Sequence, residues 1–212
     1  MIVLDLCRQL CPEKIPVKIA GPIGFGGADG EIFGIENIPN KVIKFSIIYN
    51  RFDNLMEAYK EPQDIYHQDL VPVLDYIMHT HPLVCATIYQ YGCLGEYSRP
   101  MPYWNNGIQT FIIHYYIMER LFPLSEDEKK VFHSIVSHED RRLIKDFSSE
   151  KLNKILQGLA YGLDFNLEMI NLFCENLRIC KINHNDLHQR NILKSINGQF
   201  KIIDFDRTIL EK

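Results

Sequence analysis

The sequence predicts an α+β fold with a β-rich first part and a helical second part. Between residues 17 and 48, apolar and β-branched residues flank a cluster of glycines, a pattern typical of short strands joined by tight turns. After Phe122 the apolar residues recur at helical spacing, over 148–163 and 166–181. Near the end, two apolar runs flank Asn197-Gly198, a dipeptide typical of β-hairpins.

Length and composition fit a globular protein and bear on its partners. A chain of 212 residues, with 46% hydrophobic and 24% charged residues, can bury a substantial core in one large domain or two small lobes. The formal net charge is −4, so the chain generates no positive field that would attract nucleic acid or an anionic membrane. We therefore expect no direct nucleic-acid partner.

Cysteine usage and hydropathy indicate an intracellular, cytoplasmic protein. The six cysteines form no CxxC pair and have no histidines at zinc-finger spacing, so we expect reduced thiols rather than a disulfide or metal framework. The first residues lack a basic segment before their short apolar run. No apolar run approaches the roughly 18 residues of a transmembrane helix, so we expect no membrane span.

The remaining elements follow from periodicity and turn residues. Residues 51–60 and 64–79 have helical spacing. Residues 83–94 and 107–121 are expected to be strands, joined by the turn-rich segment between them. Ser125, followed by an acidic first turn, predicts a helix start.

Asp186, Asn191 and Asp204 flank the predicted hairpin, in the stretch HNDLHQRNILKSINGQFKIIDFD. A hairpin brings the start of one strand beside the end of the other, so we expect Asn191 and Asp204 to lie close together. Their oxygens would suit Mg²⁺, a hard cation that prefers oxygen ligands. Asp186 would then be left to orient or deprotonate a nucleophile. In the alternative interpretation, Asp186 caps a turn and Asn191 bonds its own backbone.

A glycine cluster lies between two predicted strands. Its members are Gly21, Gly24, Gly26, Gly27 and Gly30. Because glycine has no Cβ, such a loop lets backbone N–H groups approach an anion closely. The cluster is therefore a candidate phosphate cover, and a structural turn is the alternative.

A lysine follows this cluster in an apolar strand. Lys44, in KVIKFSII, would be costly to bury unless its ammonium meets a phosphate or a carboxylate. Glu57, in the helix that follows, is the first candidate for that carboxylate, and Glu61 is the second. Lys41 could replace Lys44, but Lys41 lies at a turn, where we expect it to be solvated.

In this order, the pieces resemble the protein-kinase-like fold. The resemblance covers residues 17–206 and rests on GFGGADGEIF (24–33), VIK (42–44), IMERL (117–121), HNDLHQRN (184–191) and IDFD (203–206). It implies two lobes: a β-rich N-lobe over 1–121, with an antiparallel sheet, a glycine-rich loop and a glutamate-bearing helix, and a helical C-lobe over 122–212. The catalytic loop HxDLxxxN followed by IIDF is its most specific part.

The resemblance assigns catalytic and metal-binding roles near the end of the chain. Asp186 would be the base or orienting acid at the acceptor hydroxyl. Asn191 and Asp204 would bind Mg²⁺. His184 would be structural and would support the metal-binding turn.

The resemblance assigns nucleotide-binding roles to the first lobe. Lys44 would hold the α- and β-phosphates of ATP and be positioned by Glu57. Backbone groups near Glu119, with Met118 beside them, would bind adenine. The glycine-rich loop would cover the phosphates through Gly24, Gly26, Gly27 and Gly30.

The sequence departs from the family pattern in four places. The glycine-rich loop has an extra residue, with Asp29 near its tip, and Asn185 replaces a common arginine. Asp206 stands where the family usually has glycine. Only RTILEK follows, so we expect a truncated C-lobe without an activation loop or later helices. That region normally holds a peptide substrate, and a partner chain that completes the C-lobe is one way to supply it.

The resemblance implies a kinase, an ATP- and Mg²⁺-dependent phosphotransferase with a hydroxyl acceptor. The leading expectation is a minimal Ser/Thr protein kinase that acts on protein. IDFDR and DLH are also similar to sequences in small-molecule and sugar kinases and in compact kinases of the haspin and tRNA-modification type. ERL is instead similar to sequences in protein kinases, including the vaccinia-related and poxviral group. Two alternatives stay open: a small-molecule or sugar kinase of this fold, and a nucleotide-binding pseudokinase that acts as a scaffold.

Overall fold

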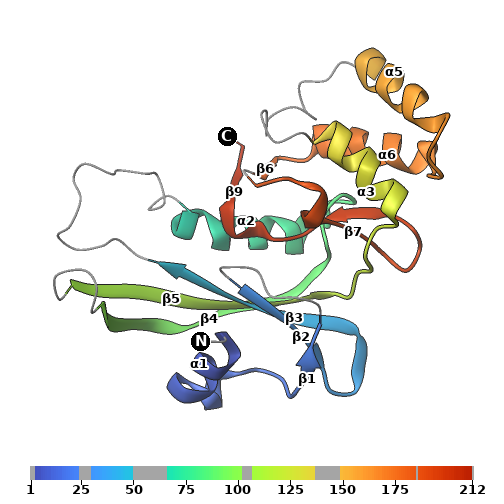
Figure 1. The fold of residues 1–212 in the computed structure, drawn as a ribbon. Helices are drawn as coiled ribbons and strands as arrows, with labels where there is room; N and C mark the ends of the chain where they lie inside the picture. The colour runs from blue at the N-terminus through green and yellow to red at the C-terminus, as the bar shows by residue number, and fades with distance from the viewer. Residues whose placement is uncertain are drawn as a thin grey trace. The chain divides into compact units, whose positions relative to one another are not determined.

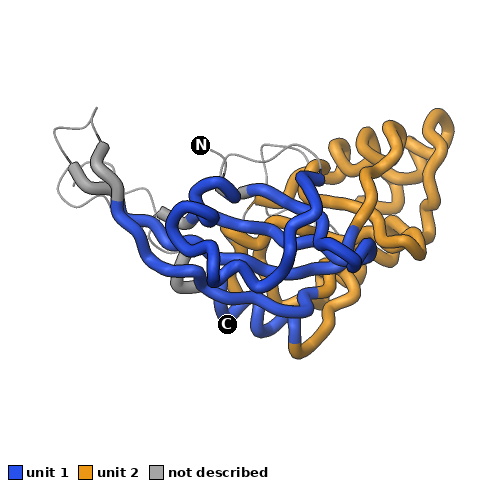
Figure 2. Tube along the Cα trace, turned by 90° about the horizontal axis from the view of Figure 1, so that it is seen from below, with its two compact units in different colours: residues 1–78, 88–120 blue, residues 79–87, 121–212 orange. Residues whose placement is uncertain are grey.

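A computed structural model describes residues 3–23, 30–49, 66–101, 107–136, 149–184 and 186–211. The chain forms two compact units (Figure 2). The first unit comprises residues 1–78 and 88–120, and the second comprises residues 79–87 and 121–212.

The first unit is built on a five-stranded antiparallel sheet (Figure 1). The strand order is β1-β2-β3-β5-β4. The strands are β1 (Ile19–Pro22), β2 (Gly30–Ile35), β3 (Ile38–Tyr49), β4 (Ile88–Met101) and β5 (Gly107–Glu119). Helix α1 (Val3–Leu10) lies on one face of the sheet and α2 (Tyr66–Thr80) on the other.

The face of the sheet toward α1 forms an apolar core. Alternate residues of each strand point to this face, because successive side chains of a strand project to opposite sides. The buried members are Leu4, Cys7, Cys11, Phe33, Ile35, Ile43, Phe45, Leu94, Phe111, Ile113, Tyr115 and Ile117. Their burial, at about 25 cal/mol per Å² of apolar surface, holds α1 on the sheet.

The opposite face of the sheet carries polar side chains. Lys44 and Ser46 of β3 and His114 and Tyr116 of β5 are all buried. The register pairs Lys44 with Tyr116 and Ser46 with His114. We refer to these four residues as the polar face of the sheet.

Strand β4 begins and ends later than predicted. The expected strand was 83–94, followed by a turn-rich segment, whereas pairing with β5 continues to Met101. The pairing register shifts between Cys93 and Gly95, where φ of Gly95 is 143°, and the strand continues beyond this irregularity. Pro100 is tolerated because β4 is an edge strand, whose outer N–H groups need no partner.

The second unit combines helices with two short strand pairs. Its helices are α3 (Glu126–Ile135), α5 (Ser149–Ala160) and α6 (Leu167–Ile179). Its strands are β6 (Ile182–His184), β7 (Ile192–Lys194), β8 (Phe200–Ile202) and β9 (Thr208–Leu210), and β6 pairs with β9 and β7 with β8. Phe132, Phe173 and Phe200 meet edge to face in its core, with ring centroids 5.0 to 6.4 Å apart.

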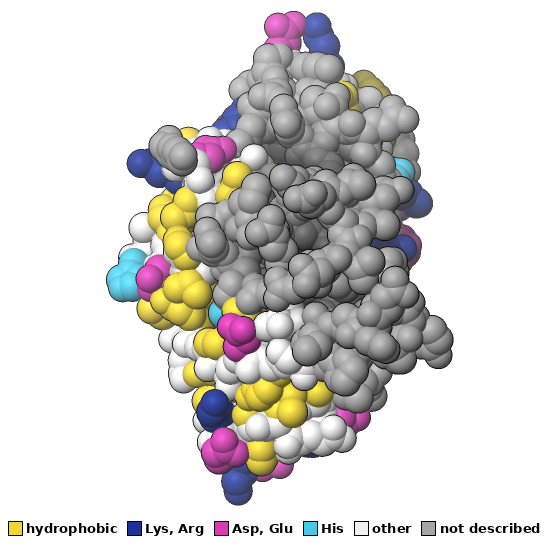
Figure 3. All heavy atoms as spheres, turned by 90° about the vertical axis from the view of Figure 1, so that its left-hand side faces the viewer, with side chains coloured by type: hydrophobic (Ala, Val, Ile, Leu, Met, Phe, Trp, Pro, Cys, Tyr) yellow, Lys and Arg dark blue, Asp and Glu magenta, His cyan; other side chains and the backbone are white. Residues whose placement is uncertain are grey.

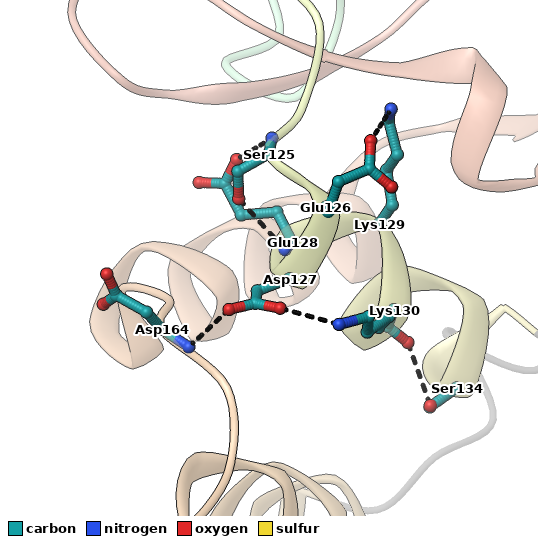
Figure 4. Close-up of polar contacts among 8 residues, drawn as sticks. All are labelled: Ser125, Glu126, Asp127, Glu128, Lys129, Lys130, Ser134 and Asp164. Carbon is teal, nitrogen blue, oxygen red and sulfur yellow. Dashed lines mark hydrogen bonds and ion pairs between the residues drawn. The ribbon is translucent and has the colours of Figure 1, made fainter.

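Helix α3 begins with a capping box at Ser125, which confirms the predicted start (Figure 4). Ser125 Oγ accepts from the N–H of Glu128 at 3.2 Å, and Glu128 Oε2 accepts from the N–H of Ser125 at 2.8 Å. The carboxylate of Glu128 also pairs with Lys194 of β7. Close by, Asp127 accepts from Lys130 and from the N–H of Asp164.

Residues 84–86 extend the β7–β8 hairpin, whereas the prediction placed them in a strand of the first lobe. The N–H of Ile202 donates to the carbonyl of Val84 at 2.7 Å, and the N–H of Ala86 donates to the carbonyl of Ile202 at 3.0 Å. Lys201 Nζ donates to the carbonyl of Cys85 at 3.2 Å. These bonds explain why residues 79–87 belong to the second unit, although the expected N-lobe ran unbroken to residue 121.

The hairpin loop is longer than the Asn-Gly signal suggested. Lys194 pairs with Phe200, so residues 195–199 form the loop. Gly198 has a φ of 82°, a conformation that favours glycine, and its N–H donates to the carbonyl of Ser195 at 2.9 Å. The hairpin itself is as predicted.

All six cysteines are free; five are buried and Cys93 is exposed. Within the described ranges, no helix is both long enough and apolar enough to cross a membrane. On the face drawn in Figure 3, the described acidic and basic side chains are interspersed.

The predicted α+β fold class is confirmed. Helices predicted at 64–79, 148–163 and 166–181 occur as α2, α5 and α6. The expected helix at 51–60 lies outside the described residues.

Candidate active site

The two ends of the β7–β8 hairpin meet at Asn191 and Asp204. Ile192 lies opposite Ile202, and the N–H of Ile203 donates to the carbonyl of Asn191 at 2.9 Å. Asp204 follows Ile203 directly. The expectation that the hairpin brings Asn191 and Asp204 together is therefore confirmed for the backbone.

The side chain of Asn191 is buried and held in one orientation. It is 5% exposed, and its Nδ2 donates to the carbonyl of Asp186 at 2.9 Å. The N–H of Asn191 donates to the carbonyl of His188 at 2.9 Å, which closes the short helical turn Gln189–Asn191. Nδ2 thus bonds the backbone of Asp186 and not the backbone of Asn191 itself, as the alternative interpretation had it, and Oδ1 is the atom that can coordinate a cation.

His184 supports this turn, as the resemblance implied. Its Nε2 donates to the carbonyl of Ile203 at 2.7 Å, and its ring lies edge-on to Phe205 with centroids 6.1 Å apart. Burial lowers the pKa of His184, against smaller raising effects from the Ile203 carbonyl and from Asp204 and Asp186. His184 is therefore held neutral with its proton on Nε2.

Asp204 has a left-handed backbone conformation, with φ 66° and ψ 68°. This conformation costs a residue other than glycine on the order of 1 kcal/mol. It persists because both polar backbone groups of the preceding residue are bonded, the N–H of Ile203 to Asn191 and its carbonyl to His184. These bonds fix the backbone that leads into Asp204.

Asp186 lies in the turn between β6 and the Gln189–Asn191 helical turn. His188 Nε2 lies 3.9 Å from Asp186 Oδ2, and His188 Nδ1 accepts from the N–H of Arg190 at 3.2 Å. Because Nδ1 is an acceptor, a neutral His188 carries its proton on Nε2, on the side of the carboxylate. The main chain of Asp186 is bonded to Asn191, so the acid and the amide belong to one fixed segment.

Asn191 and Asp204 carry oxygen atoms of the kind that a magnesium ion prefers. No three His, Cys, Asp or Glu side chains converge on one point within the part of the chain that the structure describes. Mg²⁺ would therefore take one amide oxygen, one carboxylate and the water or phosphate oxygens that it usually keeps. The metal-binding role of Asn191 and Asp204 and the proton-transfer role of Asp186 stay predictions.

In the first unit, Lys44 occupies the middle of β3. It is 4% exposed, which confirms the expected lysine in an apolar strand. Its neighbours in the register are Ile32 on β2 and Tyr116 on β5, and its Nζ lies 5.5 Å from the centroid of the Tyr116 ring. Lys41, the alternative, lies over the ring of the exposed Tyr89 instead.

Strand β5 ends at Glu119, beside the buried Met118. Glu119 lies opposite Lys41 in the register, and burial followed by the charge of Glu119 raises the pKa of Tyr89. The N–H of Arg120 donates to the carbonyl of Asn40 at 2.9 Å. The adenine-binding role of this segment stays a prediction.

Part of the predicted nucleotide site lies outside the described residues. This part includes Gly24, Gly26, Gly27, Asp29, Asn185, Glu57 and Glu61. Gly30 is the first residue of β2. The phosphate cover and the carboxylate partner of Lys44 therefore stay predictions.

Sequence reasoning missed the polar residues that accompany Lys44. Ser46 could have been found, because strand alternation places it on the same side as Lys44. His114 and Tyr116 could not, because their pairing depends on the register between β3 and β5, which the sequence does not specify. His188 was noted only as part of the loop motif.

The sequence matches no protein-family model and no curated protein. Similar solved structures include WbdD with the kinase inhibitor LY294002, at 12% identity and a TM-score of 0.40, covering 90% of this chain and 33% of that chain. A second WbdD structure matches at 13% identity and 0.43, covering 92% and 34%. The ROP18 kinase domain with AMP-PNP and sucrose matches at 12% and 0.43, covering 89% and 51%.

This chain spans about a third to about a half of the length of those proteins. Such identities and TM-scores are too low to indicate function, so the fold assignment follows from the order and connection of the elements. The first unit has a five-stranded antiparallel sheet with Lys44 in β3 and a helix between β3 and β4. In the second unit, the loop between β6 and β7 ends at Asn191, whose carbonyl accepts from the N–H of Ile203, the residue after β8. These features agree with the protein-kinase-like fold that the sequence resembles.

Proposed function

We propose that this protein is an ATP- and Mg²⁺-dependent phosphotransferase that transfers a phosphoryl group to a hydroxyl acceptor. The observation that carries the proposal is the fixed turn around Asn191. Its backbone carbonyl is bonded to the residue before Asp204, and its side chain is bonded to the main chain of Asp186. An amide oxygen and two carboxylates on two backbone segments that are bonded to one another are what phosphoryl transfer needs.

Each residue has a distinct task in this reaction. Asn191 and Asp204 hold the metal ion, which when bound offsets the negative charge of the phosphates. Asp186 accepts the proton of the acceptor hydroxyl as its oxygen bonds to the terminal phosphorus and ADP leaves. Lys44 binds the α- and β-phosphates, and the glycine-rich loop covers them.

The leading acceptor class is a serine or threonine hydroxyl of a protein. The experiment is transfer of γ-labelled phosphate from ATP to a cell lysate and to a panel of sugars and small hydroxyl compounds, with and without chelation of Mg²⁺. We expect Mg²⁺-dependent labelling of protein. Labelling of a small compound and of no protein would assign the chain to the small-molecule or sugar kinases.

The variants follow from the contacts. Asn191 bonds the main-chain carbonyl of Asp186, so Asp186→Ala leaves that bond in place. We expect at least a 100-fold loss of transfer with an unchanged melting temperature, because a general base contributes about 10²–10⁴-fold. Lys44→Ala should also abolish transfer, whereas the exposed Asp5→Ala is a control that should not. Full activity of Asp186→Ala would overturn the mechanism.

A pseudokinase predicts a different combination of results. ATP with Mg²⁺ would raise the melting temperature by mass action, and no acceptor would be labelled. Asp204→Ala would then weaken the Mg²⁺-dependent part of the shift. This outcome would keep the nucleotide site and reject the transfer reaction.

A further inference from the structure

Tyr116 of β5 lies opposite Lys44 of the neighbouring strand β3, on the same face of the sheet. The register of β3 and β5 pairs them directly, and both project to the polar face of the sheet, away from the apolar core beneath α1. Tyr116 is fully buried, and Lys44 is 4% exposed. The Lys44 ammonium lies 5.5 Å from the centroid of the Tyr116 ring.

This distance is within the range of a cation–π interaction. An ammonium within about 6 Å of an aromatic centroid is attracted by the negative face of the ring, and the attraction is stronger where water is excluded. It favours the charged form of lysine in a place where burial alone disfavours charge. It also limits where the ammonium can lie, because a fully buried ring is fixed by close packing.

We infer that Tyr116 is a positioning residue that keeps the Lys44 ammonium charged and directed toward an anionic ligand. The catalytic consequence rests on the proposed function, which assigns Lys44 to the phosphates of ATP. Lys44 has other interactions besides this ring. The share contributed by the ring can be isolated because the attraction depends on the electron density of the ring face.

A fluorination series separates this attraction from packing. Tyr116 is replaced by phenylalanine and by its mono-, di- and trifluoro derivatives, which withdraw electrons from the ring face with little change of shape. The matched control is the same series at Tyr115, the next residue of β5. Tyr115 is also buried, but it belongs to the apolar core on the other face of the sheet, where its hydroxyl accepts from Gln90 at 3.0 Å.

Two readouts are measured for each series. The first is the rate at which an amine-reactive reagent labels Lys44, followed by mass spectrometry of peptides, which requires no catalysis. A weaker ring attraction increases the fraction of Lys44 in the neutral form that the reagent attacks. We therefore expect the labelling rate to rise in steps, by about tenfold over the series at position 116. The second is KM for ATP against kcat, where we expect KM to rise in the same order at equal melting temperatures.

The outcomes distinguish this inference from the proposed function. A graded rise in labelling at 116 with a flat series at 115 supports the inference, even if the unsubstituted protein transfers no phosphate and the proposed function fails. A flat labelling series at 116, or equal changes at 115 and 116, overturns it. If transfer occurs and KM for ATP stays constant across the 116 series, the catalytic consequence is overturned.

Discussion

The ion pair between Glu128 and Lys194 should stabilise the second unit through one carboxylate that serves two elements. Glu128 Oε2 caps α3 at Ser125, and Oε1 pairs with Lys194 of β7. The side chain of Glu128 is 8% exposed and that of Lys194 is 29% exposed. Lys194→Met therefore leaves a nearly buried carboxylate without its cation, whereas Glu128→Gln removes the charge and keeps an oxygen for the cap.

The two single variants should differ in size. Breaking a buried pair costs about 3–5 kcal/mol, and the partial exposure of Lys194 reduces this to about 2 kcal/mol for Lys194→Met. Glu128→Gln should cost about 1 kcal/mol, since its cap is retained. The double variant buries no unpaired charge and should also cost about 1 kcal/mol, so the coupling energy is about 2 kcal/mol.

Urea unfolding followed by far-ultraviolet circular dichroism measures these free energies of unfolding. Each kcal/mol of lost stability should lower the melting temperature by roughly 2–4 °C. The control is Lys154→Met, which breaks the exposed pair with Glu150 at 2.8 Å and should change stability by less than about 0.5 kcal/mol. If the effects of Glu128→Gln and Lys194→Met simply add, the pair is not coupled and the reasoning is wrong.

Three other outcomes follow from single positions. Burial acts to raise the pKa of Glu128, but Lys194 and the cap lower this pKa overall. The stabilising contribution of Glu128 is therefore complete above the ordinary pKa of 4.5 and is lost as the pH falls below that value. Measured as a function of pH in the acid range, the free energy of unfolding should show this loss, and Glu128→Gln should not show it. Gly198→Ala should cost about 1 kcal/mol in urea unfolding because φ is 82°, whereas Gly158→Ala, at an open position of α5, should add up to about 1 kcal/mol. Asp204→Gly should relieve about 1 kcal/mol of backbone strain and raise the melting temperature while abolishing phosphate transfer.

Features that depend on neighbouring residues were predictable from the sequence. The start of α3 at Ser125 follows from local capping chemistry, and the approach of Asn191 to the residues before Asp204 follows from a hairpin only a few residues long. In both cases the partners are close in the chain, so few alternative geometries compete. The fold class could be predicted for the same reason.

Features that depend on distant pairing were not predictable. Residues 84–86 have the β-branched and apolar composition of the strand that follows them, and composition does not reveal that they pair with β8 more than a hundred residues later. The partner of Lys44 on β5 likewise depends on register, and a shift of one residue would replace Tyr116 by the core-facing Tyr115. Sequence periodicity specifies which side chains share a face of one strand, but not which side chains meet across two.

Lys44 and Asp204 both break a local rule of protein structure. A lysine is buried in the middle of a strand, and an aspartate adopts a left-handed backbone conformation. Each violation lowers stability unless its surroundings compensate, and in each case neighbours hold the residue in place, Tyr116 beside Lys44 and the bonds of Ile203 before Asp204. Selection for stability alone would favour an apolar residue at the first position and glycine at the second. Their joint presence, at the positions to which the proposal assigns the phosphates and the metal ion, is what a functional requirement would produce.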